Sequence, residues 1–406
     1  MRLFNLALLA IISPFLTACS PSGGPTFGPQ TEITLSTAGE VTGPRFSEGA
    51  AGDVVLSWME SRESGTALQY AELADGSFST PQSVVTESRM FVNWADLPSV
   101  MKVSADHLIA HWLRYSADAV YSYDVVVSQS INGGATWSEG ITAHSDGTPT
   151  EHGFVSMYPG VDGVALLWLD GRDTAEEPGE NILDTSMTLR SAVLTSDGRV
   201  TRKQLIDESV CDCCQTDVAI SSKGPLAVYR DRTVDEIRDI YIARSVDGQW
   251  QPGRRIYADN WTIAGCPVNG PSIVANDNFV AIAWFSAANN RPVVRVVTSD
   301  DGGTTFADPV EVASGRLAGY VGLALLDDDS LVTSWVGRNG SGNNALNLRR
   351  LSKKLRLEPV QEIAEIAQLR VFPQIAVRNN NLFVAWTDDI DGSRQLQLVR
   401  IPVATY

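Results

Sequence analysis

The sequence predicts an all-β protein, a seven-bladed β-propeller made of four-stranded blades. Three observations support this fold class: a strand-like segment ending in an aromatic residue recurs seven times, each copy sits in the same order of short strands, and a spare strand stands at the N-terminus. The copies are 51 to 61 residues apart. Their aromatic residues are Trp58, Trp112, Trp168, Tyr229, Trp284, Trp335 and Trp386.

Each repeat contains four short segments with the composition of strands. A segment such as LPSV or GPSI comes first, and the aromatic strand follows it. An alternating strand such as YDVVVSQS or PVVRVVTS is third, and a turn leads to a fourth. Runs rich in Val, Ile and aromatic residues, separated by Gly, Asp and Asn, are typical of strands. Seven repeats of four strands therefore predict a propeller.

The two ends of the chain are predicted to close the ring. The seventh repeat stops after its third strand, RQLQLVRIP, and the segment TEITLST (31–37) precedes the first repeat. We expect this N-terminal segment to supply the missing outer strand of the last blade, which would cover a sheet edge. The sequence shows no internal linker, so residues 31–406 are predicted to form one domain.

The N-terminus has the pattern of a bacterial lipoprotein signal. Arg2 precedes an apolar run that is too short for a membrane span and has the shape of a secretory signal. The run ends in LTAC, which resembles a lipobox, so we expect a signal peptide over 1–18, lipidation of Cys19 and a flexible tether over 19–30. Ser20, after the cysteine, favours the outer membrane, facing the periplasm.

The charge limits the classes of partner. A net charge of −17 argues against nucleic acid and anionic lipid as partners. The expected partners are the membrane, through the lipid on Cys19, and a small ligand or metal; a protein partner stays open.

Two turns carry a second signature. SINGGATW (130–137) and SDDGGTTF (299–306) fit the pattern S-x-D/N-x-G-x-T-aromatic, and SVDGQW (245–250) is a degenerate copy. These turns are similar to the Asp-boxes of BNR-repeat, sialidase-like propellers. Over residues 40–406 the chain resembles BNR-repeat, sialidase-like proteins of the bacterial envelope, and the phrases TEHGFVSM, WLDGRD, VCDCCQTD, YRDRTVDEIRDI and GCPVNGP carry the resemblance.

The resemblance implies a fold more firmly than an activity. Sialidases share three arginines for the sugar carboxylate, a Tyr–Glu nucleophile pair, an Asp acid/base and a first-blade (F/Y)-R-I-P motif. Here the RIP motif is Arg400 to Pro402, in the last blade, and Arg45 in GPRF is an isolated match. Catalytic residues therefore stay unassigned, and exo-sialidase or another glycoside hydrolase is kept as an alternative.

The cysteines are crowded into one short stretch. Cys211, Cys213 and Cys214 lie within VCDCC, and aligning the repeats places Cys211 on Cys266 and Cys213 on His152. Each of these positions begins an innermost strand, and such strands converge on the central channel. We therefore expect the four cysteines and His152 to meet at the channel mouth.

Three interpretations of this cluster stay open. The cysteines can form disulfides, for example a Cys211–Cys266 staple between two blades, as an oxidising compartment permits. They can instead hold Cu(I) or Zn(II) with His152 as an extra ligand. Cys211 and Cys214 can also act as a redox dithiol. The predicted function is binding of a soft metal or small ligand, with a disulfide-stapled interaction scaffold as a further alternative.

Charged residues at the ends of the aromatic strands form a second predicted group at the mouth. Guanidinium groups can bind carboxylate, phosphate or sugar through paired hydrogen bonds. The competing interpretation is a network of salt bridges between blades. The other histidines, His107, His111 and His144, are interpreted as ordinary strand and loop residues. The predicted ligand-binding residues are Arg172, Arg190, Arg230, Asp231, Arg232 and Asn269.

Overall fold

A computed structural model describes residues 26–49, 52–74, 76–160, 162–174 and 185–404. The predicted signal peptide and Cys19 lie outside this part, as does most of the tether. Within the described residues, no helix is long and apolar enough to cross a membrane.

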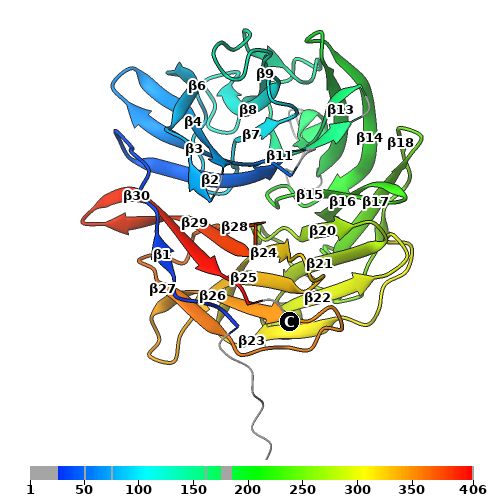
Figure 1. Cartoon of the computed structure of the whole chain (residues 1–406). Coiled ribbons are helices and arrows are strands. Elements are labelled where there is room, and N and C mark those ends of the chain that lie inside the picture. The colour runs from blue at the N-terminus through cyan, green and yellow to red at the C-terminus, as the bar shows by residue number, and fades with distance from the viewer. Residues whose placement is uncertain (1–25, 50–51, 75, 161, 175–184, 405–406) are drawn as a thin grey trace, which may run out of the picture.

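The described strands form seven antiparallel sheets around one axis, which confirms the predicted propeller (Figure 1). We number the sheets as blades 1 to 7 in chain order. The innermost strands are β2 (Val41–Glu48), β7 (Ser99–Lys102), β11 (His152–Gly160), β15 (Asp217–Ser221), β20 (Ser272–Asn276), β24 (Leu317–Leu325) and β28 (Gln374–Arg378).

Each innermost strand pairs with a second strand that carries the repeated aromatic residue. The second strands are β3 (Val54–Arg62), β8 (Leu108–Tyr115), β12 (Gly163–Asp170), β16 (Gly224–Arg230), β21 (Phe279–Ser286), β25 (Leu331–Arg338) and β29 (Asn381–Ile390). The third strands are β4 (Gly65–Ala74), β9 (Tyr123–Ser130), β13 (Met187–Thr195), β17 (Ile240–Val246), β22 (Val293–Ser299), β26 (Asn344–Leu351) and β30 (Ser393–Pro402).

Short strands complete the outer edges. Blades 1 and 4 each carry two of them on the third strand, and the other five blades carry one. The outer strands are β5 (Ser77–Phe78), β6 (Gln82–Glu87), β10 (Ile141–Thr142), β14 (Val200–Val210), β18 (Gln249–Trp250), β19 (Arg254–Arg255), β23 (Val310–Ser314), β27 (Gln361–Glu365) and β1 (Thr31–Glu32). Two short 3₁₀ helices are described, η1 (Arg172–Thr174) and η3 (Ala288–Asn290).

The N-terminal segment closes the ring as predicted. In β1, Thr31 lies opposite Arg400 of β30, and the amide of Ile33 donates to the carbonyl of Leu398. The contact begins earlier than the sequence indicated, because Phe27 is buried and forms a bridge with Val403. Blade 7 therefore combines the two ends of the chain, and its outer edge is covered.

The repeated aromatic residues are buried between blades, and most of their polar atoms have carboxylate partners. The indoles of Trp112, Trp168 and Trp284 each donate to a carboxylate at 2.7 Å. The hydroxyl of Tyr229 donates to Asp207 at 2.6 Å. A buried indole or phenol that lost its hydrogen bond would cost free energy, so these pairs fix both the depth and the orientation of the rings.

The two turns that resemble Asp-boxes share one hydrogen-bonding pattern. Ser130 and Ser299 each accept the amide of the residue four positions later at 2.9 Å. Asn132 and Asp301 each accept the amide four positions later, at 2.9 and 2.8 Å. Both turns follow third strands, away from the axis, so their side chains cap the backbone at the rim.

Candidate functional site

The innermost strands all begin at one end of the ring, which we call the start face. Two polar side chains there hold the backbone of the next blade. Asp96 accepts the amide of Phe154 at 2.8 and 2.9 Å, and Asn269 accepts that of Tyr320 at 2.7 Å. Phe154 and Tyr320 have φ of +54° and +56°, a conformation that bulky residues rarely adopt. Each anchor therefore stabilises a bulge in the neighbouring innermost strand.

Asn269 was predicted to bind ligand, but the structure gives it another role. Its side chain is 4% exposed, and its amide nitrogen donates to the carbonyls of Pro267 and Ala318 at 2.9 and 3.1 Å. Because its side-chain oxygen accepts the amide of Tyr320, both ends of the side-chain amide are hydrogen-bonded to backbone groups. Asn269 holds blade 5 to blade 6.

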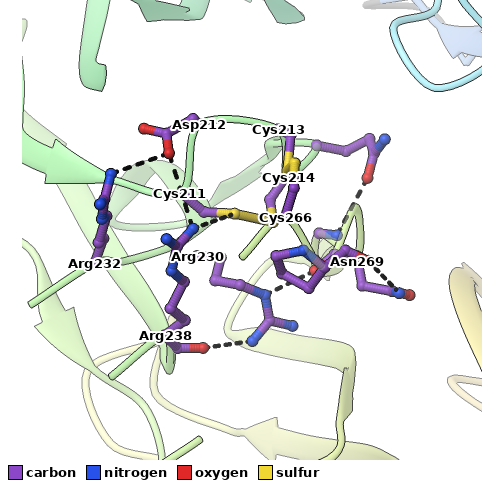
Figure 2. The surroundings of a disulfide bond; sticks show 12 residues. Cys211, Asp212, Cys213, Cys214, Arg230, Arg232, Arg238, Cys266 and Asn269 are labelled. Atoms are coloured by element: carbon purple, nitrogen blue, oxygen red, sulfur yellow. Dashed lines mark hydrogen bonds and ion pairs between the residues drawn. A yellow bond between two sulfur atoms is a disulfide. The ribbon is translucent and has the colours of Figure 1, made fainter. Parts of the chain in front are cut away.

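The four cysteines do meet at the start face, as two disulfides (Figure 2). Cys211 pairs with Cys214, and Cys213 pairs with Cys266 across blades 4 and 5. The Cys211–Cys266 staple suggested by the repeat alignment is therefore wrong, because the connections before the two strands differ in length. Cys211 and Cys214 are buried, whereas Cys266 is exposed. In this pairing no sulfur is a free thiolate, so a thiolate metal site requires prior reduction.

His152 does not join the cysteines, contrary to the prediction. Its Nε2 lies 3.2 Å from Asp146 Oδ1 and 3.6 Å from Asp170 Oδ1. Its ring stacks on His144 with centroids 3.7 Å apart. Among the described residues, no group of candidate ligands contains both His152 and a cysteine. The alignment correctly placed His152 at the start of β11, but the side chain belongs to the junction of blades 2 and 3.

Arg230 is a clamp between blades. It is 2% exposed, and its Nε, Nη1 and Nη2 donate to the carbonyls of Asn269, Arg238 and Phe285 at 2.8, 2.5 and 2.7 Å. Its guanidinium lies over the ring of Trp261. Burial lowers the pKa of Arg230 to about 9. All three nitrogens serve the fold, so Arg230 does not reach a ligand.

Next to the disulfides, two arginines share one carboxylate. Arg232 and Arg238 each donate to Glu236 at 2.7 Å. Arg232 also reaches Asp212 at 3.1 Å, as Figure 2 shows. Arg238 Nη1 lies 3.6 Å from Cys211 Sγ. Arg238 was not among the predicted site residues, although it stands in the same charged run of sequence. These contacts are salt bridges, as the competing interpretation expected, but they lie within blade 4 and not between blades.

The remaining predicted charges are also largely occupied. Arg172 forms a paired contact with Asp170, at 2.6 Å for both bonds, and Arg190 reaches Asp173 at 3.3 Å. Asp231 is 7% exposed, and burial, followed by the charge of Asp207, raises its pKa to about 7. The predicted residues thus do not converge on one pocket.

A cavity of about 690 Å³ lies along the axis, lined by the innermost strands. Arg45, set aside as an isolated motif match, is the single arginine among its lining residues in the described chain. Arg45 Nη1 donates to the carbonyls of Val155 and Leu97 at 2.6 and 3.2 Å. Within the described residues, its Nε and Nη2 make no hydrogen bond, so they can serve a ligand in the cavity.

Carboxyl groups give this cavity its charge. Glu48 and Asp217 line it, and desolvation raises the pKa of both. Asp217 is already engaged, because it accepts the amide of Ile273 and the hydroxyl of Ser272 at 2.9 and 3.1 Å. Glu48 lies at the end of β2, and its side chain stays exposed to solvent. Asp327 is a further exposed residue of the lining, so the cavity offers one guanidinium donor and two exposed carboxyl groups, those of Glu48 and Asp327.

Aromatic rings cover the start face near the axis. Trp94, Tyr320 and Phe372 come from three different parts of the chain and contact one another, with centroids 4.7 to 5.7 Å apart. Gln215, from blade 4, donates to the carbonyl of Ala95 at 2.8 Å. These contacts tie opposite sides of the ring together at that end.

Comparisons with known proteins show the fold and no family. No family model matches the chain, and no curated protein matches it. A protein of unknown function from Dyadobacter fermentans aligns with TM-score 0.51 and 11% identity, over 92% of this chain and 98% of that one. The polysaccharide lyase Uly1 aligns with TM-score 0.51 and 9% identity, over 95% and 94%. A Trypanosoma rangeli sialidase aligns with TM-score 0.40 and 12% identity, over 92% and 60%. At these identities the chain is similar to them in fold alone.

The different exposure of the two disulfides predicts an order of reduction. Thiol–disulfide exchange needs access to sulfur, so Cys213–Cys266 should open under native conditions while the buried Cys211–Cys214 bond persists until unfolding. Alkylation and peptide mass spectrometry along a glutathione gradient measure the order. Simultaneous opening, or earlier opening of Cys211–Cys214, would contradict the structure.

Asp96 predicts a pH dependence of stability. Burial raises its pKa from 3.8 to about 7, so between these values the folded chain binds more protons than the unfolded chain, and the free energy of unfolding falls as pH rises. Asp96→Asn keeps an acceptor for Phe154, as Asn269 does for Tyr320. In the wild type the free energy of unfolding should fall between about pH 5 and 8, and Asp96→Asn should make this fall smaller by on the order of 2 kcal/mol, as measured by urea unfolding.

The reciprocal variant is the matched control. Asn269→Asp places a carboxyl at the equivalent position of blade 5 and should steepen the loss of stability with rising pH. Unchanged slopes in both variants would show that Asp96 does not titrate in this window.

Proposed function

We propose that this chain is a disulfide-stapled propeller of the bacterial envelope that binds a small, hydroxyl-rich ligand, such as the end of a saccharide, in its axial cavity. The observation that carries the proposal is Arg45, which faces the cavity with two nitrogens that no described residue uses. The envelope location rests on the lipobox-like N-terminus and stays a prediction.

The size and chemistry of the cavity support a small polar ligand. Its volume of about 690 Å³ lies within the range of about 300–1,000 Å³ that small-molecule sites occupy. Arg45 can donate to a ring or hydroxyl oxygen, and Glu48 can accept from a hydroxyl. Phe154, Tyr158 and Phe372 contribute apolar surface for the face of a sugar ring.

The same residues argue for a neutral ligand. One arginine stands among the acidic residues Glu48, Asp217 and Asp327, so the lining is net negative and disfavours an anionic sugar. A sialidase-type carboxylate site would need further arginines. Glycoside hydrolysis generally needs a pair of working carboxyl groups, and because Asp217 is held by the backbone, such a reaction would have to use Glu48 and Asp327.

Substitution of Arg45 tests the proposal. The chain would first be screened against a panel of neutral oligosaccharides, and the best binder titrated by calorimetry. Arg45→Met should weaken binding at least about 10-fold, because a hydrogen bond from a charged donor contributes about 1.5–3 kcal/mol. Glu48→Gln, which disturbs no anchor of the fold, should also weaken it.

Arg291→Met is the control, because Arg291 is an exposed arginine that pairs with Glu311 at the rim. It should bind like the wild type. Absence of any saccharide binder, or binding that survives both cavity substitutions, would reject the proposal.

One observation favours a second candidate, binding of Cu(I) or Zn(II) by the reduced cysteines. The sulfur atoms of Cys211, Cys213 and Cys214 all lie within 4.8 Å of one another. Arg238, 3.6 Å from Cys211 Sγ, would favour a thiolate there after reduction. Elemental analysis should then find about one more copper or zinc per reduced chain than per oxidised chain. Equal metal content in the two forms would reject this candidate.

A further inference from the structure

A buried cluster of histidines and aspartates lies between blades 2 and 3, apart from both the axial cavity and the cysteines. His144 and Asp146 belong to the connection between β10 and β11, and His152 is the first residue of β11. Asp170 ends β12, and Asp124 lies in β9. His144, His152 and Asp170 are 5%, 0% and 0% exposed. From this cluster we infer a divalent metal site whose ligands are His152 Nε2, Asp146 Oδ1 and Asp170 Oδ1.

The surroundings of His152 determine which ring nitrogen is free. Its Nδ1 lies 3.2 Å from the carbonyl oxygens of both Tyr123 and Thr150. A carbonyl only accepts, so Nδ1 carries the proton and the Nε2 of the neutral ring carries a lone pair. Within the described residues this buried Nε2 makes no hydrogen bond. It faces two carboxylate oxygens, at 3.2 and 3.6 Å, which also accept hydrogen bonds from Thr148 and Arg172. A nitrogen lone pair faces carboxylate oxygens favourably only around a cation or a shared proton.

The spacing of the three atoms suits a metal ion. All three lie within 4.8 Å of one another. Nitrogen and oxygen ligands stand about 2.0–2.2 Å from zinc, so tetrahedral ligand atoms are about 3.3–3.6 Å apart. The two distances measured from Nε2, 3.2 and 3.6 Å, are close to this spacing.

The outer shell of the site is already built. Asp146 Oδ2 receives His144 Nδ1 at 2.8 Å and lies 3.1 Å from Arg172 Nη2. Asp170 Oδ2 receives the indole of Trp168 at 2.7 Å and Arg172 at 2.6 Å. Metal-binding carboxylates and imidazoles are oriented by such contacts. The supporting groups are thus in place around a nitrogen that itself lacks a partner.

The charge of the cluster favours a dication. Asp124, Asp146 and Asp170 are faced closely by one guanidinium, that of Arg172, while the Nε of Arg190 is 3.8 Å from Asp170. One imidazole with two carboxylates is a donor set for Zn²⁺ or Mn²⁺ rather than for Cu(I).

The site would fix the connection between blades 2 and 3. Asp146 lies on that connection, whereas His152 and Asp170 are on adjacent strands of blade 3, so an ion would tie the two blades together. The side chains of Asp124 and Arg172 are 25% and 24% exposed, which leaves an approach from solvent on that side.

Metal loading of the oxidised chain tests the inference. The chain, without a histidine tag and without reductant, would be equilibrated with ZnCl₂ or MnCl₂ alone and assayed by elemental analysis. Keeping the disulfides intact removes the cysteines as competing ligands. We expect about one ion per chain in the wild type and under about 0.1 in His152→Gln and Asp146→Asn, with a 10–100-fold loss of affinity in His144→Gln.

The control is His111→Gln, because His111 is a fully buried histidine of blade 2 outside the cluster. It should load like the wild type. Urea unfolding without metal checks that each variant folds. If His152→Gln does not fold, Asp146→Asn provides the test. Equal loading of the wild type and the folded cluster variants would overturn the site. So would a wild type that takes up neither ion, even if acidification changes its stability, because the cluster would then hold only a proton.

Discussion

The ring depends on buried hydrogen bonds that fix innermost strands to the neighbouring blade near the start face. Asp96 holds Phe154, and Asn269 holds Tyr320, each in a backbone conformation that a bulky residue does not adopt by itself. Arg230 adds a clamp from blade 4 to the backbone of blade 5. Loss of any of these hydrogen bonds would leave a polar group unpaired in the interior, which costs free energy. They set the shape of the axial cavity and of the start face.

This constraint explains why conspicuous charged residues are occupied. The strong donors Arg172, Arg230 and Arg232 bond to carboxylates or carbonyls of their own blade. Arg230 and Arg232 also donate to carbonyls of a neighbouring blade. The cysteines follow the same logic, since Cys213–Cys266 joins the starts of β15 and β20. Arg45 differs, because it lines the axial cavity, where no described residue accepts a hydrogen bond from its Nε or Nη2.

The fold could be predicted from the sequence because each blade repeats the same local pattern of strands at a nearly constant spacing. The spacing of residues such as Trp112 and Trp168 reflects the length of a blade, and the spare N-terminal strand follows from an incomplete last repeat. The disulfide pairing was not predictable to the residue, since Cys211 and Cys213 differ by two positions and the connections before their strands vary in length. His144 was interpreted as ordinary because its partner, His152, lies in the next blade.

Two candidate sites, the axial cavity and the cluster around His152, form where side chains of different blades meet. No sequence motif marks either site. The axial cavity is formed by side chains from all seven innermost strands, each ordinary in its own repeat. The cluster around His152 gathers residues from two blades and their connection. Contacts of this kind depend on which blades are neighbours around the axis. They can therefore be identified only from the three-dimensional arrangement of the blades.

The most direct test of the central claim is a crystal structure of the chain with the tightest-binding neutral oligosaccharide. The account predicts density for the sugar within the axial cavity, with an oxygen in hydrogen-bond reach of Arg45 Nε or Nη2. Density on the start face against Arg172 or Arg232, with the axial cavity empty of sugar, would contradict it.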